Sequence, residues 1–357
     1  MRVVLVDGAV LDTSDPASVA AFRASHADLL SSLGALAHET KGNTVLADRI
    51  RHKFRIKNTT GYSLNALVDY DDPVDILIHL LIGSEGTLGF MSDITYHKVA
   101  EHPCKASALV VFDDLESACK VVTLLSAAPV AAVELMDRAA LRSVEQKPGM
   151  PENIGALGPD GAALLIETRA ETAVGLEAQI RTVTDLLGAI STFGPLRFST
   201  DPDECQQYWN IRKGTFPSVG AMRDAGTTVV IEDVAFPVAR LAAATLDLQA
   251  LLRTHGYASA IIFGHALAGN LHFVFTQDFN SDAEVNRYAR FMDAVCDLVV
   301  HQYDGSLKAE HGTGRNMAPF VELEWGRDAY ALMHRIKTLL DPLNLLNPGV
   351  LLNADRR

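Results

Sequence analysis

The chain of 357 residues contains only four cysteines, and no two of them form a CxxC pair. Their spacing therefore provides neither a local iron–sulfur or Cys-rich zinc site nor a disulfide framework, and a reducing, cytoplasmic compartment is expected. The most apolar stretch, "ILIHLLIG", is far too short to span a bilayer. The opening "MRVVLVDGAV" does not have the form of a signal peptide, because Asp7 breaks its apolar run.

Positive charge is also scarce, since 31 Lys and Arg stand against 44 Asp and Glu and the formal net charge is −13. This excess of negative charge argues against nucleic acid and against anionic membrane surfaces as partners. Apolar residues make up 48% of the chain, which argues against disorder. The length is enough for two domains and a sizeable core.

Three regions differ in pattern along the chain. Residues 1–100 are predicted to be strand-and-loop in character and to begin with a hairpin that turns at Asp7-Gly8. From about residue 105, short apolar strands alternate with longer helices, which predicts a layered fold of the α+β or α/β type. A last helix and a turn-rich tail follow. The elements expected in the middle region are strands at 105–112, 162–168, 192–199 and 227–236, a strand followed by a helix within 131–144, and helices at 113–127, 171–189, 202–216, 237–254 and 283–303.

The stretch "GHALAGNLH" places two histidines, His265 and His272, within an apolar run. Its two glycines and its Asn disfavour a helix, so a strand, a turn and a second strand are predicted. In such a hairpin the two imidazoles approach each other, and a pair of neutral imidazoles suits a borderline divalent metal such as zinc. The alternative is a pair of core histidines that cap backbone groups.

A second stretch, "GSLKAEHGTGRNM", contains a candidate third metal ligand for a two-histidine site. The carboxylate of Glu310 is a natural third ligand. His311, if the segment is a strand, points to the opposite side and is free for proton transfer. Gly312 and Gly314 permit the close approach of a flat cofactor or substrate. The alternative is a turn with an exposed histidine.

Two further stretches offer binding groups. The loop "GSEGTLG", residues 83–89, can present backbone N–H groups to an anion or a ring edge, although it is neither a Walker A loop nor GxGxxG. A tight β-turn is its alternative. The stretch "YWNIRKG" places Arg212 and Lys213 at the end of a helix, and Arg can hold a carboxylate through two parallel N–H bonds. The alternative there is a solvated helix end.

In this order, "GSEGTLG", "GHALAGNLH", "AEHGTG" and "LDPLNLLNPG" resemble motifs of the FAD-linked oxidases of the vanillyl-alcohol-oxidase type. Within that family the chain looks like the D-lactate and D-2-hydroxyglutarate dehydrogenases. Finer cues such as "VELMDRAALRSV" and "VVIEDVAFP" look most like the long form of the latter, in which an iron–sulfur half follows the flavin half. The resemblance covers nearly the whole chain.

The resemblance implies an α+β fold in three parts. Residues 1–100 correspond to the second subdomain of a two-subdomain FAD-binding domain, and residues 101–318 to a ferredoxin-like substrate (cap) domain with an antiparallel sheet. Residues 319–357 form a helix and a tail that return to the FAD domain. The family's pyrophosphate loop lies in a first subdomain, upstream of these residues. We therefore expect an internal fragment of a longer polypeptide, one that binds FAD poorly by itself.

The resemblance also implies roles for single residues. His265, His272 and Glu310 become the ligands of one divalent metal, most fittingly zinc, and are expected to converge on one point. His311 becomes the catalytic base. The substrate-binding residues are Arg212, which clamps the carboxylate, its neighbour Lys213, and Asn270. The residues that contact FAD are Gly83, Ser84, Glu85, Gly86, Thr87, Gly89 and Asn347. In the family an Asp often stands two residues before the Asn, whereas this chain has Ala268 there, so a charged neighbour of the metal is missing.

These roles predict the oxidation of a D-2-hydroxy acid, of the D-2-hydroxyglutarate or D-lactate class, to the 2-oxo acid. Hydride passes from C2 to flavin N5, the metal lowers the pKa of the substrate hydroxyl, and neutral His311 accepts the proton. The electron acceptor stays open, with a following iron–sulfur domain of the same polypeptide as one candidate.

Two other function classes remain. The chain could be a metal-binding fragment without redox activity, or a metallohydrolase that uses the two histidines and Glu310 with His311 as base. The second is disfavoured because "GSEGTLG" and "NPG" would then have no role.

Overall fold

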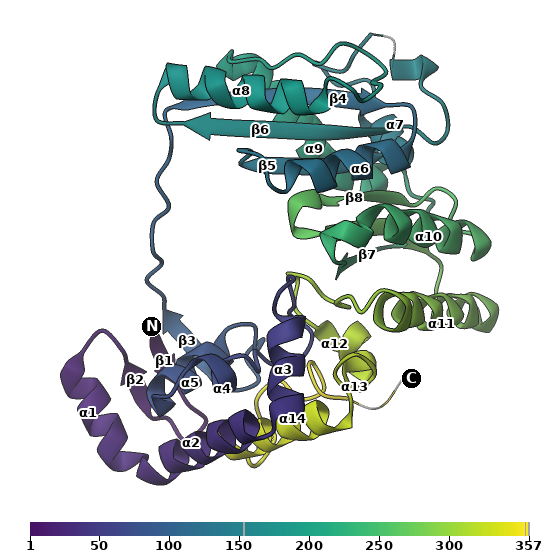
Figure 1. Cartoon of the computed structure of the whole chain (residues 1–357). Helices are drawn as coiled ribbons and strands as arrows, with labels where there is room; N and C mark the ends of the chain where they lie inside the picture. The colour runs from purple at the N-terminus through teal and green to yellow at the C-terminus, as the bar shows by residue number, and fades with distance from the viewer. Residues whose placement is uncertain (153, 354, 356–357) are drawn as a thin grey trace. The chain divides into compact units, whose positions relative to one another are not determined.

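The computed structural model describes residues 1–152, 154–353 and 355, and the chain divides into two compact units (Figure 1). The first unit combines Met1–Val99 with Ser306–Arg357, and the second is Ala100–Gly305. The sequence placed the end of the second region at residue 318 instead of 305. The difference arises because the segment after Gly305 hydrogen-bonds within the first unit, as described below. Glu310 and His311 therefore belong to the first unit, and His265 and His272 to the second.

The first unit is mainly helical, so the expectation of a strand-and-loop region at residues 1–100 was wrong. Among its described residues, its sheet has three short antiparallel strands in the order β2-β1-β3. They are β1 (Arg2–Val4), β2 (Val10–Asp12) and β3 (Phe90–Asp93). The predicted turn joins β1 to β2, with Gly8 at φ 84°. The helices of the unit are α1 (Pro16–Ser25), α2 (Ala27–Gly42), α3 (Thr44–Lys53), α4 (Ala66–Asp69), α5 (Pro73–Leu81), α12 (Gly314–Met317), α13 (Val321–Trp325) and α14 (Arg327–Leu340).

Local signals account for these helices. Helix α1 begins where the Asp15 carboxylate accepts the backbone N–H of Ala17, with Pro16 at the first helical position. Helix α2 buries Leu30, Leu33, Leu36 and Ala37, which lie three or four residues apart on one face. They join the core of the first unit, to which α5 and α14 also contribute. Weak helix formers inside α2, among them Gly34 and Thr40, obscured this helix in the sequence pattern.

The second unit is built on a six-stranded antiparallel sheet in the order β4-β6-β5-β8-β9-β7, which confirms the predicted α+β fold with an antiparallel sheet. The strands are β4 (Cys104–Phe112), β5 (Ala132–Asp137), β6 (Ala162–Ala170), β7 (Thr228–Ala235), β8 (Ile261–His265) and β9 (Asn270–Gln277). The helices are α6 (Leu115–Leu125), α7 (Arg138–Val144), α8 (Ala173–Leu187), α9 (Pro202–Met222), α10 (Leu241–Thr254) and α11 (Asp282–Asp297). Residues 192–199, expected as a strand, contribute one bridge, between Ser199 and Ser107, because Gly194 and Pro195 interrupt the ladder.

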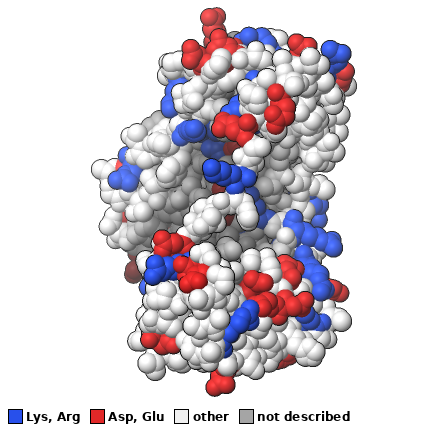
Figure 2. Space-filling model, turned by 90° about the vertical axis from the view of Figure 1, so that its left-hand side faces the viewer, with Lys and Arg blue, Asp and Glu red and all other residues white. Residues whose placement is uncertain are grey.

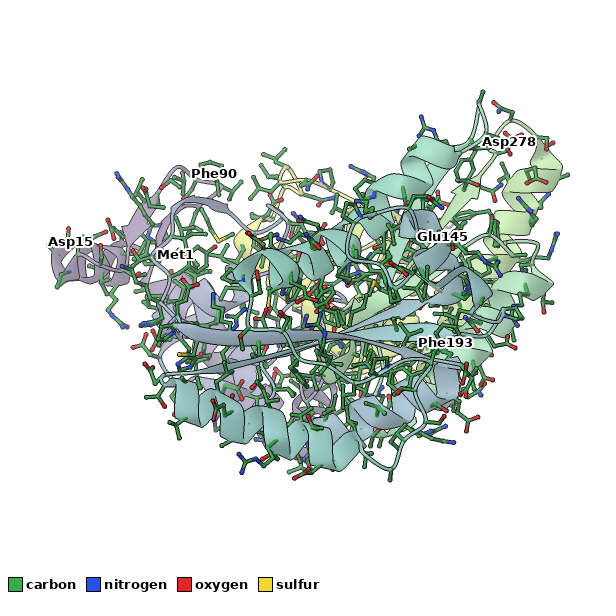
Figure 3. The ribbon with its side chains drawn as sticks, turned by 90° about the horizontal axis from the view of Figure 1, so that it is seen from above. Met1, Asp15, Phe90, Glu145, Phe193 and Asp278 are labelled. Atoms are coloured by element: carbon green, nitrogen blue, oxygen red, sulfur yellow. The ribbon has the colours of Figure 1, made fainter. Side chains whose placement is uncertain are left out.

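Helices cover both faces of this sheet (Figures 1 and 3). On one face, Tyr208 and Ile211 of α9 pack with Met136 and Leu165 of the strands. On the other face, Leu176 of α8 packs with alanines of β4 and β6. Helix α9 therefore lies over the face that carries Glu134 and His265, which are cross-strand partners. No helix in the described part of the chain is long and apolar enough to cross a membrane.

Asp137 is a buried residue that ends β5 and caps the N-terminus of α7. Its carboxylate accepts the backbone N–H of Ala140 at 2.8 Å and is 3% exposed. Burial raises the pKa of Asp137 to about 6. Hydrogen bonds from Ala140, Ile262 and Gln249 lower the pKa but only partly offset the effect of burial. The native state therefore holds this proton more tightly than the unfolded chain does. Its contribution to stability is complete below the unfolded pKa of about 3.9 and is lost as the pH rises through 6.

We expect Asp137→Asn to raise the free energy of unfolding at about pH 8 by roughly 1–3 kcal/mol, because Asn keeps the cap acceptor without a buried charge. At a pH near 4 the gain should largely disappear. Urea titrations of both proteins at the two pH values measure this difference. A gain of equal size at both pH values would contradict the assignment.

Candidate functional site

Two histidines of the second unit stand on one tight hairpin, as predicted. Strands β8 and β9 are joined by a 3₁₀ turn at Ala266–Ala268. A Cβ at Gly264 would collide with the carbonyl oxygen of Asn270, and a Cβ at Gly269, whose φ is 64°, would collide with that of Phe236. The glycines of "GHALAGNLH" are therefore required by close backbone approach.

The two imidazoles lie close together. The ring centroids of His265 and His272 are 5.5 Å apart and their planes are 88° apart. Rings bound to one zinc through bonds of about 2.0–2.1 Å would have centroids roughly 5 Å apart. Nδ1 of His265 lies 2.7 Å from Oε1 of Glu134, so a carboxylate can fix the tautomer and leave Nε2 for another partner. The pair therefore fits the donor set of a divalent metal.

Glu134 joins this hairpin to helix α9, and sequence reasoning missed it. Its side chain is 6% exposed, and Oε2 accepts Nε–H of Arg212 at 2.8 Å. The guanidinium also lies over the ring of Phe263, with 4.5 Å from Cζ to the ring centroid. These contacts use Nε and one face of the guanidinium, so its two terminal nitrogens can bind a carboxylate. The available signal was an acidic residue within an apolar strand, "AAVELMD".

The other two predicted substrate residues are placed differently. Arg212 and Lys213 lie in the middle of α9, not at a helix end as the sequence suggested, and consecutive helical residues point about 100° apart. Lys213 lines a separate groove together with Trp209 and Arg169. Asn270 is buried at the start of β9, and its side-chain amide donates to the carbonyl oxygen of Val234 at 3.3 Å. Of these residues, only Arg212 is bonded to the carboxylate that also holds His265.

In the first unit, the loop "GSEGTLG" exposes backbone. Gly83, Glu85 and Gly86 all have positive φ, at 75°, 52° and 70°. The loop is closed by Thr87, whose hydroxyl donates to the carbonyl oxygen of Ser84 at 2.7 Å. A Cβ at Gly86 would meet nothing within 4 Å. The hydroxyl of Ser84 is buried and has no hydrogen-bond partner among the described residues. A bare backbone surface and a buried hydroxyl without a protein partner are features that favour a ligand site.

Three separate motifs meet at Glu85. Asn347 donates from its side-chain amide to the carbonyl oxygen of Glu85 at 2.7 Å. The backbone N–H of Gly314 donates to the Glu85 carboxylate at 3.3 Å, and a Cβ at Gly312 would collide with that side chain. Burial raises the pKa of Glu85, while the Gly314 bond opposes the shift. The structure thus brings "GSEGTLG", "AEHGTG" and "NPG" together within the first unit.

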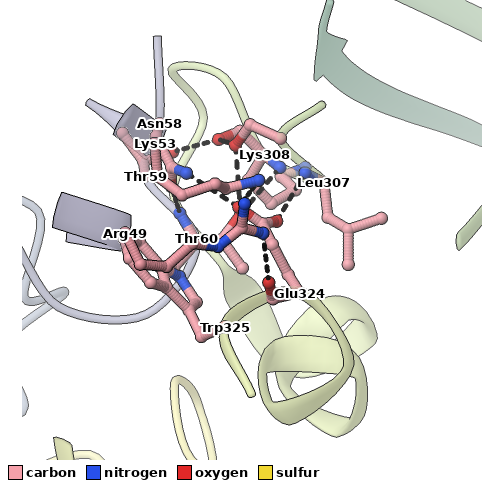
Figure 4. Close-up of polar contacts among 10 residues, drawn as sticks. Arg49, Lys53, Asn58, Thr59, Thr60, Leu307, Lys308, Glu324 and Trp325 are labelled. Atoms are coloured by element: carbon pink, nitrogen blue, oxygen red, sulfur yellow. Dashed lines mark hydrogen bonds and ion pairs between the residues drawn. The ribbon is translucent and has the colours of Figure 1, made fainter. Parts of the chain in front are cut away.

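The segment that carries Glu310 and His311 is a loop, not a strand, and the first unit holds it at several points (Figure 4). The Glu324 carboxylate accepts the backbone N–H of Leu307 at 2.7 Å, and the Thr60 hydroxyl accepts that of Lys308 at 3.0 Å. Nζ of Lys57 lies 2.5 Å from Oε2 of Glu310. Local sequence contains no signal for Thr60 and Lys57 as partners of this loop, because they lie about 250 residues away in the chain.

Comparison with known proteins identifies similar chains. Residues 101–351 match the family model "FAD linked oxidases, C-terminal domain". The chain is 30% identical to the mitochondrial D-lactate dehydrogenase [cytochrome] of Arabidopsis thaliana, over 77% of this chain and 47% of that protein. It is 25% identical to the glycolate oxidase subunit GlcD of Bacillus subtilis, over 79% and 58%. It is 28% identical to D-2-hydroxyglutarate dehydrogenase of Pantoea ananatis, over 81% and 29%.

A solved structure shares the fold. The crystal structure of p-cresol methylhydroxylase with substrate bound superimposes with a TM-score of 0.51 and 15% sequence identity, over 70% of this chain and 53% of that chain. At this identity the likeness concerns the fold alone. The chain spans 47% to 58% of the length of the D-lactate dehydrogenase and GlcD relatives and a smaller share of the third.

Proposed function

Because the chain belongs to the family of FAD-linked oxidases, C-terminal domain, we propose that it is the part of a flavoenzyme that holds a 2-hydroxy acid while this acid is oxidised to the 2-oxo acid. The observation that carries the proposal is Glu134, which binds Nε of Arg212 and Nδ1 of His265 at once. The buried carboxylate of Glu134 thereby orients two groups side by side. One is the Arg212 guanidinium, which can bind a substrate carboxylate, and the other is the His265 imidazole, which can bind a metal.

In this arrangement, Arg212 would bind the carboxylate of the substrate and the histidines would hold a metal near its hydroxyl group. The two terminal nitrogens of Arg212 bind the substrate carboxylate in a bidentate pair. We propose His265 and His272 as metal ligands with Glu310 as the third, and His311 as the acceptor of the hydroxyl proton. When bound, a divalent metal supplies positive charge that lowers the pKa of the hydroxyl.

The course of the chain supports Glu310 in that role. Gly305, the last residue of the second unit, packs so closely on the carbonyl oxygen of Ala235 that a Cβ would collide with it. Ala235 pairs with Asn270, two residues before His272. Glu310 lies five residues after Gly305, so the Cα atoms of the two residues are at most about 17 Å apart. Convergence of the three ligands on one point stays a prediction.

The flavin contacts are proposed for the first unit. The backbone of "GSEGTLG", the Ser84 hydroxyl and Asn347 would contact the cofactor, and FAD, when bound, supplies the two-electron acceptor that no side chain provides. Because the chain spans 47% to 58% of the length of the D-lactate dehydrogenase and GlcD relatives, we propose the oxidation for a whole protein and not for these residues alone. The substrate classes are those that the relatives' names give, D-lactate, glycolate and D-2-hydroxyglutarate.

A substrate panel on the full-length parent protein tests this function. Purified protein is assayed with both enantiomers of lactate and 2-hydroxyglutarate and with glycolate, with an artificial electron acceptor. We expect one of these acids to bleach the flavin and reduce the acceptor. Turnover of an ester or amide by flavin-free protein would instead support the metallohydrolase. Zinc binding without turnover of any hydroxy acid would support the redox-inert alternative.

Arg212→Lys tests the carboxylate clamp in the same protein. The variant keeps the charge, but an ammonium group cannot form two parallel hydrogen bonds to a carboxylate. We expect kcat/KM to fall at least about tenfold, which corresponds to roughly 1.4 kcal/mol. An unchanged kcat/KM would contradict the clamp and leave Arg212 as a structural ion-pair partner of Glu134.

A further inference from the structure

A groove in the second unit lies apart from the Arg212 site. It has a volume of about 730 Å³, within the range of small-molecule sites. Its walls come from the segment Glu101–Pro103, the start of β4, the end of β6 and one face of α9. On α9 the lining residues are Pro202, Cys205, Gln206, Trp209 and Lys213, which recur at helical spacing. Tyr208 and Ile211, on the opposite side of the same helix, belong to the core.

The groove is lined by one more cation than carboxylate, in a chain whose formal net charge is −13. Lys105, Arg169 and Lys213 line it, against Glu101 and Glu167. Figure 2 shows the side of the molecule where β4 begins and β6 ends, and there Lys and Arg side chains stand among acidic and neutral ones. The ammonium group of Lys213 has no ion-pair partner in the described part of the chain. Arg169 binds Glu167 through Nε, which leaves its terminal nitrogens for an anion.

Glu167 holds the wall of the groove in place. Its side chain is 5% exposed and lies 2.5 Å from Nε of Arg169. Its other oxygen accepts Nε1–H of Trp209 at 2.6 Å and the hydroxyl of Ser107 at 3.2 Å. The carboxylate therefore fixes an indole ring and a guanidinium in neighbouring positions without a ligand. Such preorganisation lowers the cost of binding.

From this geometry we infer that the groove is a binding site for a small planar organic anion, whose carboxylate or phosphate group binds Arg169 and Lys213 while its flat body lies against Trp209. An aromatic wall recognises a flat ring system, and the two cations recognise the anionic group. The site does not depend on the hydroxy-acid oxidation, because Arg212, Glu134 and His265 do not line it.

Fluorescence titrations of the chain with adenosine 5′-monophosphate, 1-naphthoate, adenosine and inorganic phosphate test the inference. The chain has two tryptophans, and Trp325 of the first unit gives a constant background. We expect one planar anion, the nucleotide or the naphthoate, to quench saturably below about 1 mM, a free energy near −4 kcal/mol. Adenosine and phosphate, which each lack one half of the recognised chemistry, should bind at least about tenfold more weakly. Trp209→Phe should abolish the response.

Lys213→Ala should weaken binding of the planar anion about tenfold or more without unfolding the protein, because Lys213 is exposed. Lys120→Ala is the matched control, since Lys120 is an exposed lysine of α6, outside the groove. Equal weakening by both variants would reduce the effect to net charge and overturn the site. Absence of saturable quenching by both planar anions up to about 10 mM, or equal affinity for phosphate alone, would also overturn it.

Discussion

Lys53→Met should lower the free energy of unfolding of the first unit by about 3–5 kcal/mol, because it leaves a buried carboxylate without its cation. Nζ of Lys53 lies 3.0 Å from Oε1 of Glu324, and both side chains are 0% exposed. Asn58 and the backbone N–H of Leu307 also donate to this carboxylate (Figure 4). Urea unfolding in a Trp209→Phe background, where Trp325 beside Glu324 is the remaining tryptophan, measures the change within this unit.

The matched control is Arg51→Met on the same helix. Arg51 pairs with Asp48 at 2.9 Å, but both side chains are more than half exposed. Breaking such a surface pair should cost less than about 1 kcal/mol. Replacing Lys53 and Glu324 together by apolar residues should recover much of the loss, since a buried ion pair stabilises little against a packed apolar pair. If Lys53→Met costs no more than Arg51→Met, the buried pair contributes no more than a surface one.

The pair also bears on the proposed chemistry, because Glu324 holds the backbone three residues before Glu310. Replacing Lys53 by Met should therefore speed hydrogen exchange at the amides of Leu307 and Lys308, beyond what global destabilisation explains. The ion pair lies at the base of the loop that carries Glu310, the proposed metal ligand, and His311, the proposed base. We therefore expect it to position this loop.

Part of the fold could be predicted from the sequence because helix caps and turn glycines act locally. Asp114 begins α6, Asp137 begins α7 and Gly269 allows the hairpin turn, and each acts within a few residues of its own position. Helix α2 was missed because its stability comes from packing Leu30 and Leu33 into a core, not from helix propensity.

In the candidate site, too, the features set by local sequence could be predicted and those set by distant contacts could not. The motifs located His265, His272 and the glycine loops, since each motif is contiguous in sequence. They could not reveal that Glu134 serves Arg212 and His265, because those partners lie 78 and 131 residues away. Two partners of the Glu310 loop, Thr60 and Lys57, lie even farther away in sequence, at 248 and 253 residues. Contacts of this kind depend on strand order and register, which a single sequence does not encode locally.

Glu134→Gln should weaken zinc binding by the chain by about 10- to 100-fold, the usual effect of removing a carboxylate that orients a ligand histidine. The substitution preserves volume but removes the negative charge next to Nδ1 of His265, 2.7 Å away, and next to Nε of Arg212, 2.8 Å away. Competition with a chromophoric chelator measures the zinc affinity without flavin or substrate. In the full-length flavoprotein, kcat/KM should fall as well, because the guanidinium loses its anchor and the imidazole its fixed tautomer.

The control for this variant is Glu204→Gln on helix α9, where Glu204 bonds to Tyr208 and Arg197 two turns before Arg212. It perturbs the same helix but touches neither His265 nor the guanidinium, so zinc affinity should stay within about twofold of the parent. Three results separate the possibilities. Loss of zinc affinity in Glu134→Gln alone supports a metal held through His265. Loss in both variants indicates a general effect of α9 on the fold. Unchanged affinity in both, with the hairpin intact, contradicts the metal role of His265, because a ligand imidazole that loses its carboxylate partner cannot keep both its orientation and its basicity.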